Sequence, residues 1–275
     1  MTQPAVTFQI KQLEEHFNTR LFDRGHGHIA LTPAGEIVLG YAERILGLSA
    51  ELDTRIKELT GEVAGVLLIG ASMTFAEFLL PRVLGEFRSL YPKVLPRLIV
   101  ANSETVENRV AEHTLDIGFI EAPSHLPSLV SDFCAEDELL VLCAPSHPLA
   151  TLKTATPGQL LAHAFISRES GSGTRAVTDH YFQKAGIRLD SLDIVMELGS
   201  PEAIKGLVST GLGFAIMSRS SVSKELKLGQ LAAIPLAPRL MRTLSVVYPK
   251  ERFRSRLSDT FIEFARERLR TAAER

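Results

Sequence analysis

The chain is poor in the features that mark secreted, membrane-bound and disulfide-rich proteins. Cys134 and Cys143 are the only cysteines among 275 residues, which excludes a disulfide framework, fits a reducing cytoplasm and predicts two buried thiols. Charged residues interrupt every apolar run well before membrane-spanning length, and no signal peptide is recognisable, so we expect a cytoplasmic protein without a membrane partner. The formal net charge of −2 gives no global positive field, so any DNA contact has to be local.

Motifs of catalysis and metal binding are absent as well. The patterns HExxH, GxSxG and CxxC do not occur, and the eight histidines are scattered without ligand spacing. His147, in "PSHPLA", is expected in a loop rather than as a catalytic base. We therefore expect no enzyme, no metal and no cofactor.

The first 35 residues predict a helix followed by a hairpin. Thr2 can cap a helix over residues 3–17, whose apolar residues recur at helical spacing on one face. The segment "NTRLFDRGHGHIALTPAG" then contains two short apolar runs around a Gly-His-Gly turn, which is typical of a β-hairpin. Thr32 and Pro33 begin the next helix, as N-cap and first helical residue.

That next helix carries a narrow apolar stripe. Its apolar residues follow one another at steps of three and four, which is the pattern of a coiled-coil seam. The seam consists of Ile37, Tyr41, Ile45, Leu48, Leu52, Ile56 and Leu59. A core helix of one globule would carry a wider stripe, so we expect residues 34–59 to hold two chains together.

After a hinge at residues 60–65 the pattern changes to alternating strands and helices. Strands are predicted at residues 66–71, in "RLIVA" and in "DIGFI", and the alternation restarts after residue 123. Strands separated by helices indicate parallel sheets built from right-handed βαβ units. A late strand at residues 242–249, followed by a helix over 255–273, would return to the first lobe, giving two α/β lobes with a ligand cleft between them.

Polar residues gather where these strands end and helices begin. Helix N-termini offer N–H groups and partial positive charge, so converging ones favour a small anion. The alternative is that each residue only caps its own helix. The candidate effector-binding residues are Ser72, Met73, Thr74, Asn102, Ser103, Glu121, Ser167, Ser170, Ser172, Thr174 and Ser200.

Taken in order, these segments resemble the LysR-type transcriptional regulators. "QPAVTFQIKQLEEHFNTRLFDR" and "ALTPAG" look like the second half of that family's winged helix-turn-helix and the start of its linker helix. "GEFRSLYPKV", "TLDIGFIEAP" and "GSGTR…GLGFAIMS" look like its periplasmic-binding-protein-like effector domain. The later stretches are similar to members controlling carbon fixation or sulfur metabolism. The resemblance implies an α/β fold with a partial winged helix-turn-helix, a linker helix and a two-lobed effector domain.

The resemblance also implies DNA-contacting residues. Recognition helices read base edges from their N-terminal residues, here Thr2, Gln3, Pro4, Thr7 and Phe8, while Lys11 and Arg24 in the wing would contact phosphates. In the family two helices precede this point, whereas Met1 falls at the turn. We therefore expect a truncated domain that binds operator DNA poorly, and residues 1–35 hold only three Lys/Arg against three Asp/Glu.

The expected domains are residues 1–32 (partial winged helix-turn-helix), 33–59 (linker helix), 60–65 (hinge) and 66–275 (effector domain). Within the last, the first lobe would cover about 66–122 and 242–275, and the second about 123–241. We expect a homodimeric or homotetrameric regulator that answers to a small, anionic metabolite. The alternatives are a solute-binding protein of the same two-lobed fold and a truncated regulator that no longer binds DNA.

Overall fold

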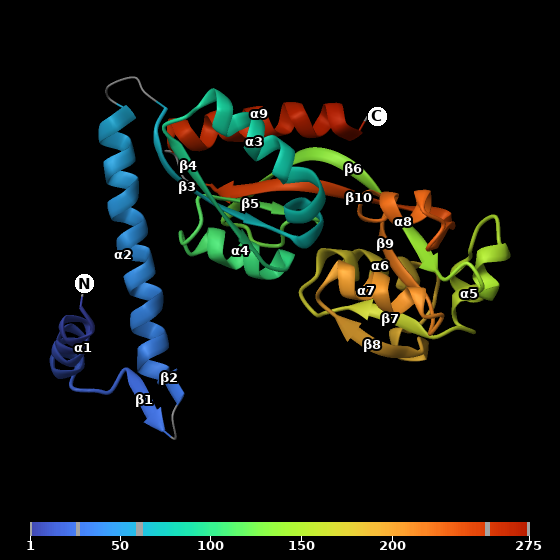
Figure 1. Ribbon diagram of the computed structural model, residues 1–275, viewed down its shortest axis with the longest axis horizontal. Helices are drawn as coiled ribbons and strands as arrows, with labels where there is room; N and C mark the ends of the chain where they lie inside the picture. Colours follow the sequence, from blue (N-terminus) through green and yellow to red (C-terminus); the bar gives the residue numbers. More distant parts are fainter. Residues whose placement is uncertain (1, 26–27, 59–62, 251–253, 274–275) are drawn as a thin grey trace. The chain divides into compact units, whose positions relative to one another are not determined.

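The structure, a computed structural model, describes residues 2–25, 28–58, 63–250 and 254–273 (Figure 1). The chain divides into two compact units, Met1–Leu52 and Asp53–Arg275. Within the described ranges, no helix is long and apolar enough to cross a membrane.

The first unit is a helix, a hairpin and most of a long helix. These elements are α1 (Gln3–Phe17), β1 (Phe22–Gly25), β2 (His28–Leu31) and α2 (Pro33–Glu58), which ends beyond the unit. The predicted hairpin is confirmed, with Phe22 opposite Leu31 in an antiparallel pair. Thr32 caps α2 as predicted, because its hydroxyl accepts a hydrogen bond from the N–H of Gly35 at 3.0 Å. Thr2 stands at the N-cap of α1, but its side chain makes no capping hydrogen bond with the described residues.

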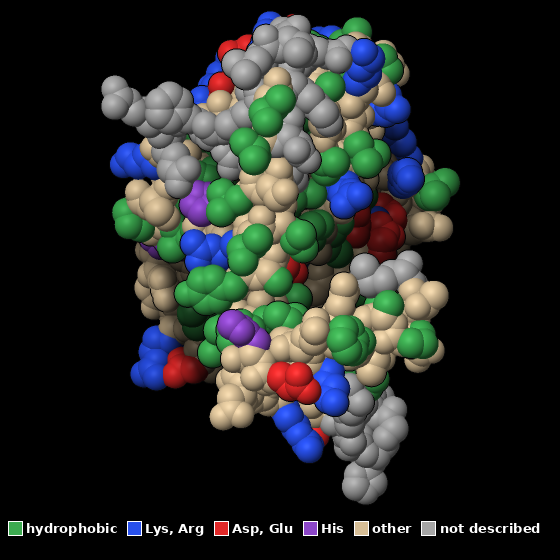
Figure 2. Space-filling view, turned by 90° about the vertical axis from the view of Figure 1, so that its left-hand side faces the viewer, with side chains coloured by type: hydrophobic (Ala, Val, Ile, Leu, Met, Phe, Trp, Pro, Cys, Tyr) green, Lys and Arg blue, Asp and Glu red, His purple; other side chains and the backbone are tan. Residues whose placement is uncertain are grey.

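Very little of the first unit is buried. Among its described residues only Leu21 and Gly35 are buried, and α1 has no buried residue. An ideal Cβ at Gly35 would lie 2.1 Å from the carbonyl oxygen of Leu21, so this close approach between α2 and the hairpin requires glycine. The described seam residues of α2, Ile37 to Ile56, are all more than half exposed. In Figure 2, hydrophobic side chains (green) are exposed at many places on the visible face.

The second unit contains two lobes. The first lobe is built from β3 (Gly65–Ala71), η1 (Phe75–Leu79), α3 (Leu80–Leu90), β4 (Val94–Val100), α4 (Ser103–Ala111), β5 (Ile117–Ile120) and α9 (Arg256–Ala273). The second lobe is built from η2 (Pro148–Thr151), α5 (Pro157–Leu160), β7 (Phe165–Arg168), α6 (Gly173–Lys184), η3 (Leu189–Ser191), β8 (Ile194–Leu198), α7 (Pro201–Ser209), β9 (Ala215–Ser218), η4 (Arg219–Ser221) and α8 (Ser223–Lys227). Two long strands, β6 (Leu129–Cys143) and β10 (Ala232–Pro249), run through both lobes (Figure 1).

The crossing strands differ from the prediction. β6 begins nine residues before the apolar run "ELLVLCAP" at residues 138–145, and β10 begins ten residues before the strand expected at 242–249. They pair with each other along most of their length and run antiparallel, so the sheet order β4-β3-β5-β10-β6-β9 is parallel only from β4 to β5. The expected parallel pairing is confirmed for β4, β3 and β5 and for β7 with β8, whereas β10, β6 and β9 pair antiparallel. The early part of β6 is interrupted by polar residues such as Ser131 and Asp132, so it contains no apolar run like the one that marks its later part.

Each lobe has its own hydrophobic core. In the first lobe α3 and α9 cover one face of the sheet and α4 covers the other (Figure 1), with Phe87 and Phe261 in edge-to-face contact at 4.8 Å between ring centroids. In the second lobe Phe165 stacks on Phe214 at 4.9 Å, and α6 and α7 complete separate clusters. The two predicted buried thiols are confirmed: burial raises the pKa of Cys134 to about 12 and that of Cys143 to about 11.

The helical stretch over residues 75–90 begins irregularly. Its first turn, η1, has π-helical hydrogen bonding, and regular α-helix follows from Leu80. Single π-turns often occur near binding sites, and this one directly follows the predicted site residues Ser72 and Thr74. Leu59 and residues 60–62, from the predicted seam and hinge, lie outside the described residues.

Candidate functional site at the junction of the lobes

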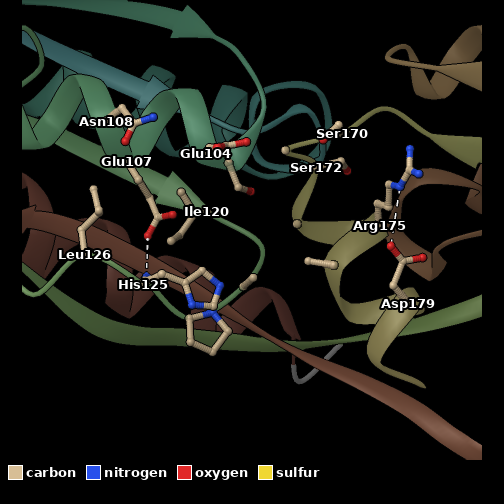
Figure 3. A pocket seen from close by; sticks show the side chains of 16 residues that line it. Glu104, Glu107, Asn108, Ile120, His125, Leu126, Ser170, Ser172, Arg175 and Asp179 are labelled. Carbon is tan, nitrogen blue, oxygen red and sulfur yellow. Dashed lines mark hydrogen bonds and ion pairs between the residues drawn. The ribbon is translucent and has the colours of Figure 1, made fainter. Parts of the chain in front are cut away.

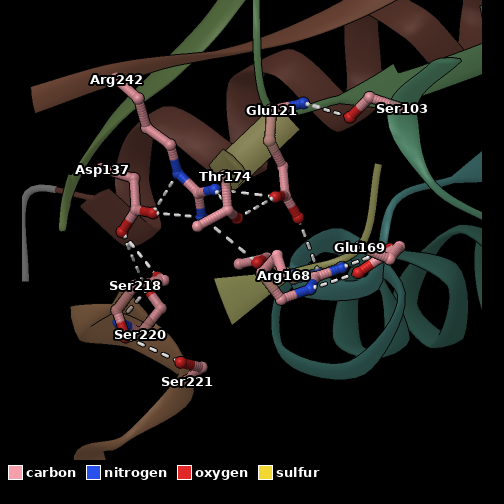
Figure 4. A network of polar contacts seen from close by, with 11 residues as sticks. Ser103, Glu121, Asp137, Arg168, Glu169, Thr174, Ser218, Ser220, Ser221 and Arg242 are labelled. Atoms are coloured by element: carbon pink, nitrogen blue, oxygen red, sulfur yellow. Dashed lines mark hydrogen bonds and ion pairs between the residues drawn. The ribbon is translucent and has the colours of Figure 1, made fainter. Parts of the chain in front are cut away.

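A buried arginine occupies the point where the crossing strands meet both lobes (Figure 4). Arg242, on β10, is directly opposite Asp137 on β6 in the strand register, and its guanidinium lies 2.6 Å from that carboxylate. The same guanidinium lies 2.7 Å from the carboxylate of Glu121, at the end of β5. Two buried carboxylates thus share one buried cation, so that each of them has an opposite charge in direct contact. We call these three residues the arginine hub.

The hub reaches both lobes through two threonines. Arg242 donates to the hydroxyl of Thr74 at 3.2 Å in the first lobe and to that of Thr174 at 2.8 Å in the second. Thr174 in turn donates to Glu121 at 2.9 Å. The hub therefore links the start of η1 to the start of α6, two segments a hundred residues apart in the chain.

Glu121 takes the place that a bound anion would have at the start of η1. Its carboxylate accepts the N–H of Thr74 at 2.9 Å. Burial by itself would raise the pKa of Glu121, but the charge of Arg242 and the hydrogen bond from Thr74 outweigh it and lower the pKa to about 2. Glu121 is therefore ionised near neutral pH, and it orients its neighbours rather than facing solvent.

Further polar side chains surround the hub. Asp137 accepts from the hydroxyl of Ser218 at 2.8 Å, and the main-chain N–H of Glu121 donates to Ser103 at 3.4 Å. Arg168, also buried, makes two hydrogen bonds to the adjacent Glu169, at 2.8 and 3.0 Å. These contacts tie β9 to β6 and the end of β5 to the start of α4, and they fix Arg168 against its neighbour at the end of β7 (Figure 4).

Two of the predicted effector residues cap their own helices. Asn102 accepts from the N–H of Thr105 at 2.9 Å and caps α4, and Ser200 accepts from the N–H of Ala203 at 3.3 Å and caps α7. These two residues therefore cap their own helices, which is the alternative to a role in ligand binding that the sequence left open. Asn102 does more, because its amide also donates to the carbonyl of Ser170 at 3.1 Å across the lobes.

Ser72, at the end of β3, differs from the two capping residues. Its side chain is buried beside the hub, and its hydroxyl has no hydrogen-bond partner among the described residues. Buried hydroxyls are nearly always bonded, so an orphan at a strand end indicates a place for a ligand or a water. Met73 beside it is half-buried, and Ser167 is buried on β7.

The remaining predicted serines line a cavity between α4 and α6 (Figure 3). Its volume is about 350 Å³, and Ser103, Ser170 and Ser172 contribute to its wall. The acidic residues Glu104, Glu107 and Asp179 line it as well, together with Arg175 and His125. Burial raises the pKa of Asp179, although Arg175 opposes this effect.

A narrow contact between the lobes borders this cavity. The N–H of Glu104 donates to the carbonyl of Gly171 at 3.2 Å. Gly171 has φ +79°, and a Cβ there would lie 2.6 Å from the Glu104 carboxylate, so the contact requires glycine at this position. The Gly-Ser-Gly loop of the sequence thus serves close approach of the two lobes.

Sequence reasoning missed the central residues of the site. Arg242, Asp137 and Arg168 were not singled out, because none of them belongs to a recognisable motif. A charged residue inside a strand that is otherwise buried is itself a signal, since such a charge has to find a partner. His147 was expected in a loop, and it caps η2 there by accepting the N–H of Leu149 at 3.2 Å.

The predicted DNA-contacting residues lie together on α1. Gln3, Pro4, Thr7, Phe8 and Lys11 surround one open depression and are all exposed. Thr2 is exposed at the N-cap, and the side chain of Arg24 lies outside the described residues.

A helix and wing followed by a long exposed helix and a two-lobed ligand-binding fold define a transcriptional regulator controlled by a small molecule. Comparison with protein families agrees: residues 1–36 match "Bacterial regulatory helix-turn-helix protein, lysR family" and residues 60–270 match "LysR substrate binding domain". The chain belongs to the LysR family of transcriptional regulators. The helix-turn-helix match excludes the solute-binding protein that the sequence left as an alternative.

Known relatives and structures narrow the resemblance. A probable RuBisCO transcriptional regulator of Synechocystis sp. is 38% identical over 95% of this chain and 77% of the relative, and one of Cyanidium caldarium is 36% identical over 95% and 84%. The regulatory domain of Synechocystis CcmR in complex with 2-PG is similar with a TM-score of 0.67 and 27% identity, over 74% of this chain and 96% of that domain. An OxyR mutant of Corynebacterium glutamicum, 20% identical with a TM-score of 0.71 over 100% of this chain and 86% of that one, shares the fold.

Proposed function

We propose that this regulator acts in the cytoplasm on carbon-fixation genes, without enzyme activity of its own, and that its effector is a small anion bound beside the arginine hub. The relatives described as RuBisCO regulators and the CcmR domain with 2-PG support this choice of genes and ligand. The observation that carries the proposed site is the buried hydroxyl of Ser72, which has no partner among the described residues.

We place the anionic group of the effector by asking which hydrogen-bonding groups of the site are still unoccupied. Glu121 already accepts the N–H of Thr74, so the effector does not replace that bond. Ser72 lies two residues before it, at the carboxyl end of β3, and can donate a hydrogen bond to an anion. We assign the cation to Arg168 of the second lobe, which is buried at the end of β7.

This placement gives the effector a mechanical role. An anion held by Ser72 of the first lobe and Arg168 of the second adds an attraction between lobes that are already joined by the hub. A ligand shifts a conformational equilibrium only by its difference in affinity for the two states. The proposed effector therefore favours the closed arrangement of the two lobes. With the domain bounds expected from the sequence, a change in the effector domain would pass through residues 60–65 to α2.

We further propose that α1 reads DNA and that α2 joins two chains. Lys11 is exposed and pairs only loosely with Glu15, at 3.6 Å, so it can turn to a phosphate at little cost. The apolar seam of α2 is exposed in one chain and would be covered by the same seam of a second. Weak operator binding stays a prediction; its structural basis is that Val6, Leu13 and Phe17 of α1 are exposed.

Calorimetry with the purified chain tests the effector site. We expect 2-PG to bind, inorganic phosphate to bind more weakly, and neutral glycerol not to bind. Ser72→Ala should weaken 2-PG binding about tenfold, the value of one hydrogen bond to a charged ligand, without loss of stability. Ser89→Ala, on the exposed side of α3, is the matched control.

Two results would contradict this assignment. Glycerol binding as tightly as 2-PG would contradict an anionic effector. Equal 2-PG affinity in the parent and in Ser72→Ala would contradict the placement of the effector at Ser72. For the genes, fluorescence anisotropy with DNA from upstream of the RuBisCO genes should show weak binding that falls steeply with salt. Nanomolar affinity at moderate salt would contradict the prediction of weak operator binding.

A further inference from the structure

The cavity between α4 and α6 is acidic, although the sequence predicted an anion at its serines. Glu104 and Glu107 line it from the first lobe and Asp179 lines it from the second (Figure 3). We propose that this cavity is a second ligand site, separate from the effector site, and that it binds a small organic amine in its ammonium form.

The first support is an uncompensated buried carboxylate. Glu107 is only 7% exposed, and its one hydrogen bond among the described residues comes from the main-chain N–H of His125, at 3.2 Å. Neither Glu107 nor Glu104 forms an ion pair within the described part of the chain. A buried carboxylate without a cation is costly, and an ammonium group in the cavity would compensate it.

A second, independent support comes from the opposite wall. Ser172 is 3% exposed, lines the cavity, and its hydroxyl has no hydrogen-bond partner among the described residues. It stands at the N-cap of α6 without capping it. A hydroxyl oxygen left in this way can accept a hydrogen bond from an N–H donor of a ligand.

The cations of the cavity wall do not cancel its acidity. The guanidinium of Arg175 lies 2.7 Å from Glu197 and 3.6 Å from Asp179, and it donates to the carbonyl of Arg168 at 3.1 Å. Arg175 is therefore already shared between two carboxylates, which leaves Glu104 and Glu107 in excess. An anion in this cavity would meet like charges, so the expectation of an anion at Ser103, Ser170 and Ser172 is replaced by a cation.

An organic cation fits better than a metal ion. Within the described ranges, no group of three His, Cys, Asp or Glu residues is arranged to hold a metal. A volume of about 350 Å³ instead suits an extended molecule of amino-acid or diamine size, at the lower end of ligand pockets. Such a ligand can place nitrogen near Glu107 in one lobe and near Asp179 in the other.

The site is distinct from the proposed effector site. Ser72 and Arg168 are not among the residues that line the cavity. The bonds from Asn102 to Ser170 and from Glu104 to Gly171 close the lobes at its border. Failure of one proposal is thus separable from failure of the other.

Calorimetry at pH 8 on the full 275-residue chain tests the cavity with named probes. Putrescine and agmatine should bind, whereas 1,4-butanediol, which has the same length without charge, should not. Glu107→Gln and Asp179→Asn should each weaken amine binding at least tenfold, and Ser172→Ala severalfold, with 2-PG binding unchanged. Glu112→Gln, an exposed carboxylate at the other end of α4, should leave amine binding unchanged.

Several outcomes would overturn the proposal. These are butanediol binding as tightly as putrescine, magnesium chloride displacing putrescine at equal concentration, or amine affinity that survives both carboxylate substitutions. Equal weakening by Glu112→Gln would show a general surface-charge effect and would overturn it too. Ser172→Ala removes only an unbonded hydroxyl, so we expect it to fold. It therefore still tests the cavity if a carboxylate variant fails to fold.

Discussion

The two units of this chain bury their apolar residues to very different degrees. In Met1–Leu52, Val6, Phe8, Leu13 and Phe17 of α1 are 40–60% exposed, and the hairpin shelters little beyond Leu21. In Asp53–Arg275, residues of the same types form four buried clusters with fully enclosed phenylalanines. Both units obey the same hydrophobic spacing rules, but only the second completes its own core.

Charged residues show the same difference. Lys11 and Glu15 on α1 form an exposed pair that contributes little, whereas Arg242, Glu121 and Asp137 are enclosed and depend on one another. The first unit therefore leaves both apolar and polar side chains exposed, where a partner can contact them. The second unit is built to hold a geometry.

The largest effect should come from placing charges in the α2 seam. Leu48→Asp with Leu52→Asp would bury two charges per chain in a dimer contact, each costing several kcal/mol, so chains should separate at micromolar concentration. Light scattering measures this. Leu39→Asp with Leu46→Asp adds the same charge on the opposite side of the helix and should leave the oligomer intact. An unchanged oligomer in the seam variant would contradict the coiled-coil hypothesis.

A pair of phenylalanines compares the two units directly. Phe87→Ala removes a fully buried ring from the first lobe and should lower the free energy of unfolding by about 3–5 kcal/mol. Phe8→Ala removes a ring that is 60% exposed and should change it by less than about 0.5 kcal/mol. Urea unfolding followed by circular dichroism gives both values. Similar losses for both would mean that α1 packs on a core in solution.

The last comparison concerns how the stability of the arginine hub depends on pH. Because the pKa of Glu121 is lowered from 4.5 to about 2, its ionised form stabilises the folded state above about pH 4.5, and this contribution is lost as pH falls towards 2. Glu121→Gln should therefore show a shallower loss of unfolding free energy between pH 4.5 and 2 than the parent. Parallel curves for the two proteins would show that the hub does not depend on this charge.

Much of the architecture could be predicted from local patterns. The hairpin, the Thr32 cap, the two buried thiols and the two-lobed α/β fold all appear as expected, because spacing, caps and turn residues act over a few neighbours. The lengths of β6 and β10 and their antiparallel direction did not follow, since strand pairing joins segments about a hundred residues apart. The candidate serines were found as strand ends, but their partners were not.

The sequence by itself determined that the chain is a LysR-type regulator, where its helices begin, and which strand ends come near the junction of the lobes. Only the tertiary structure decided what those ends do. Arg242 meets Asp137 because register in an antiparallel pair places them opposite each other, 105 residues apart. Glu107 and Asp179 line one cavity because the fold brings α4 of the first lobe close to α6 of the second. Charge compensation depends on distance in space, and a linear pattern carries that distance only for near neighbours.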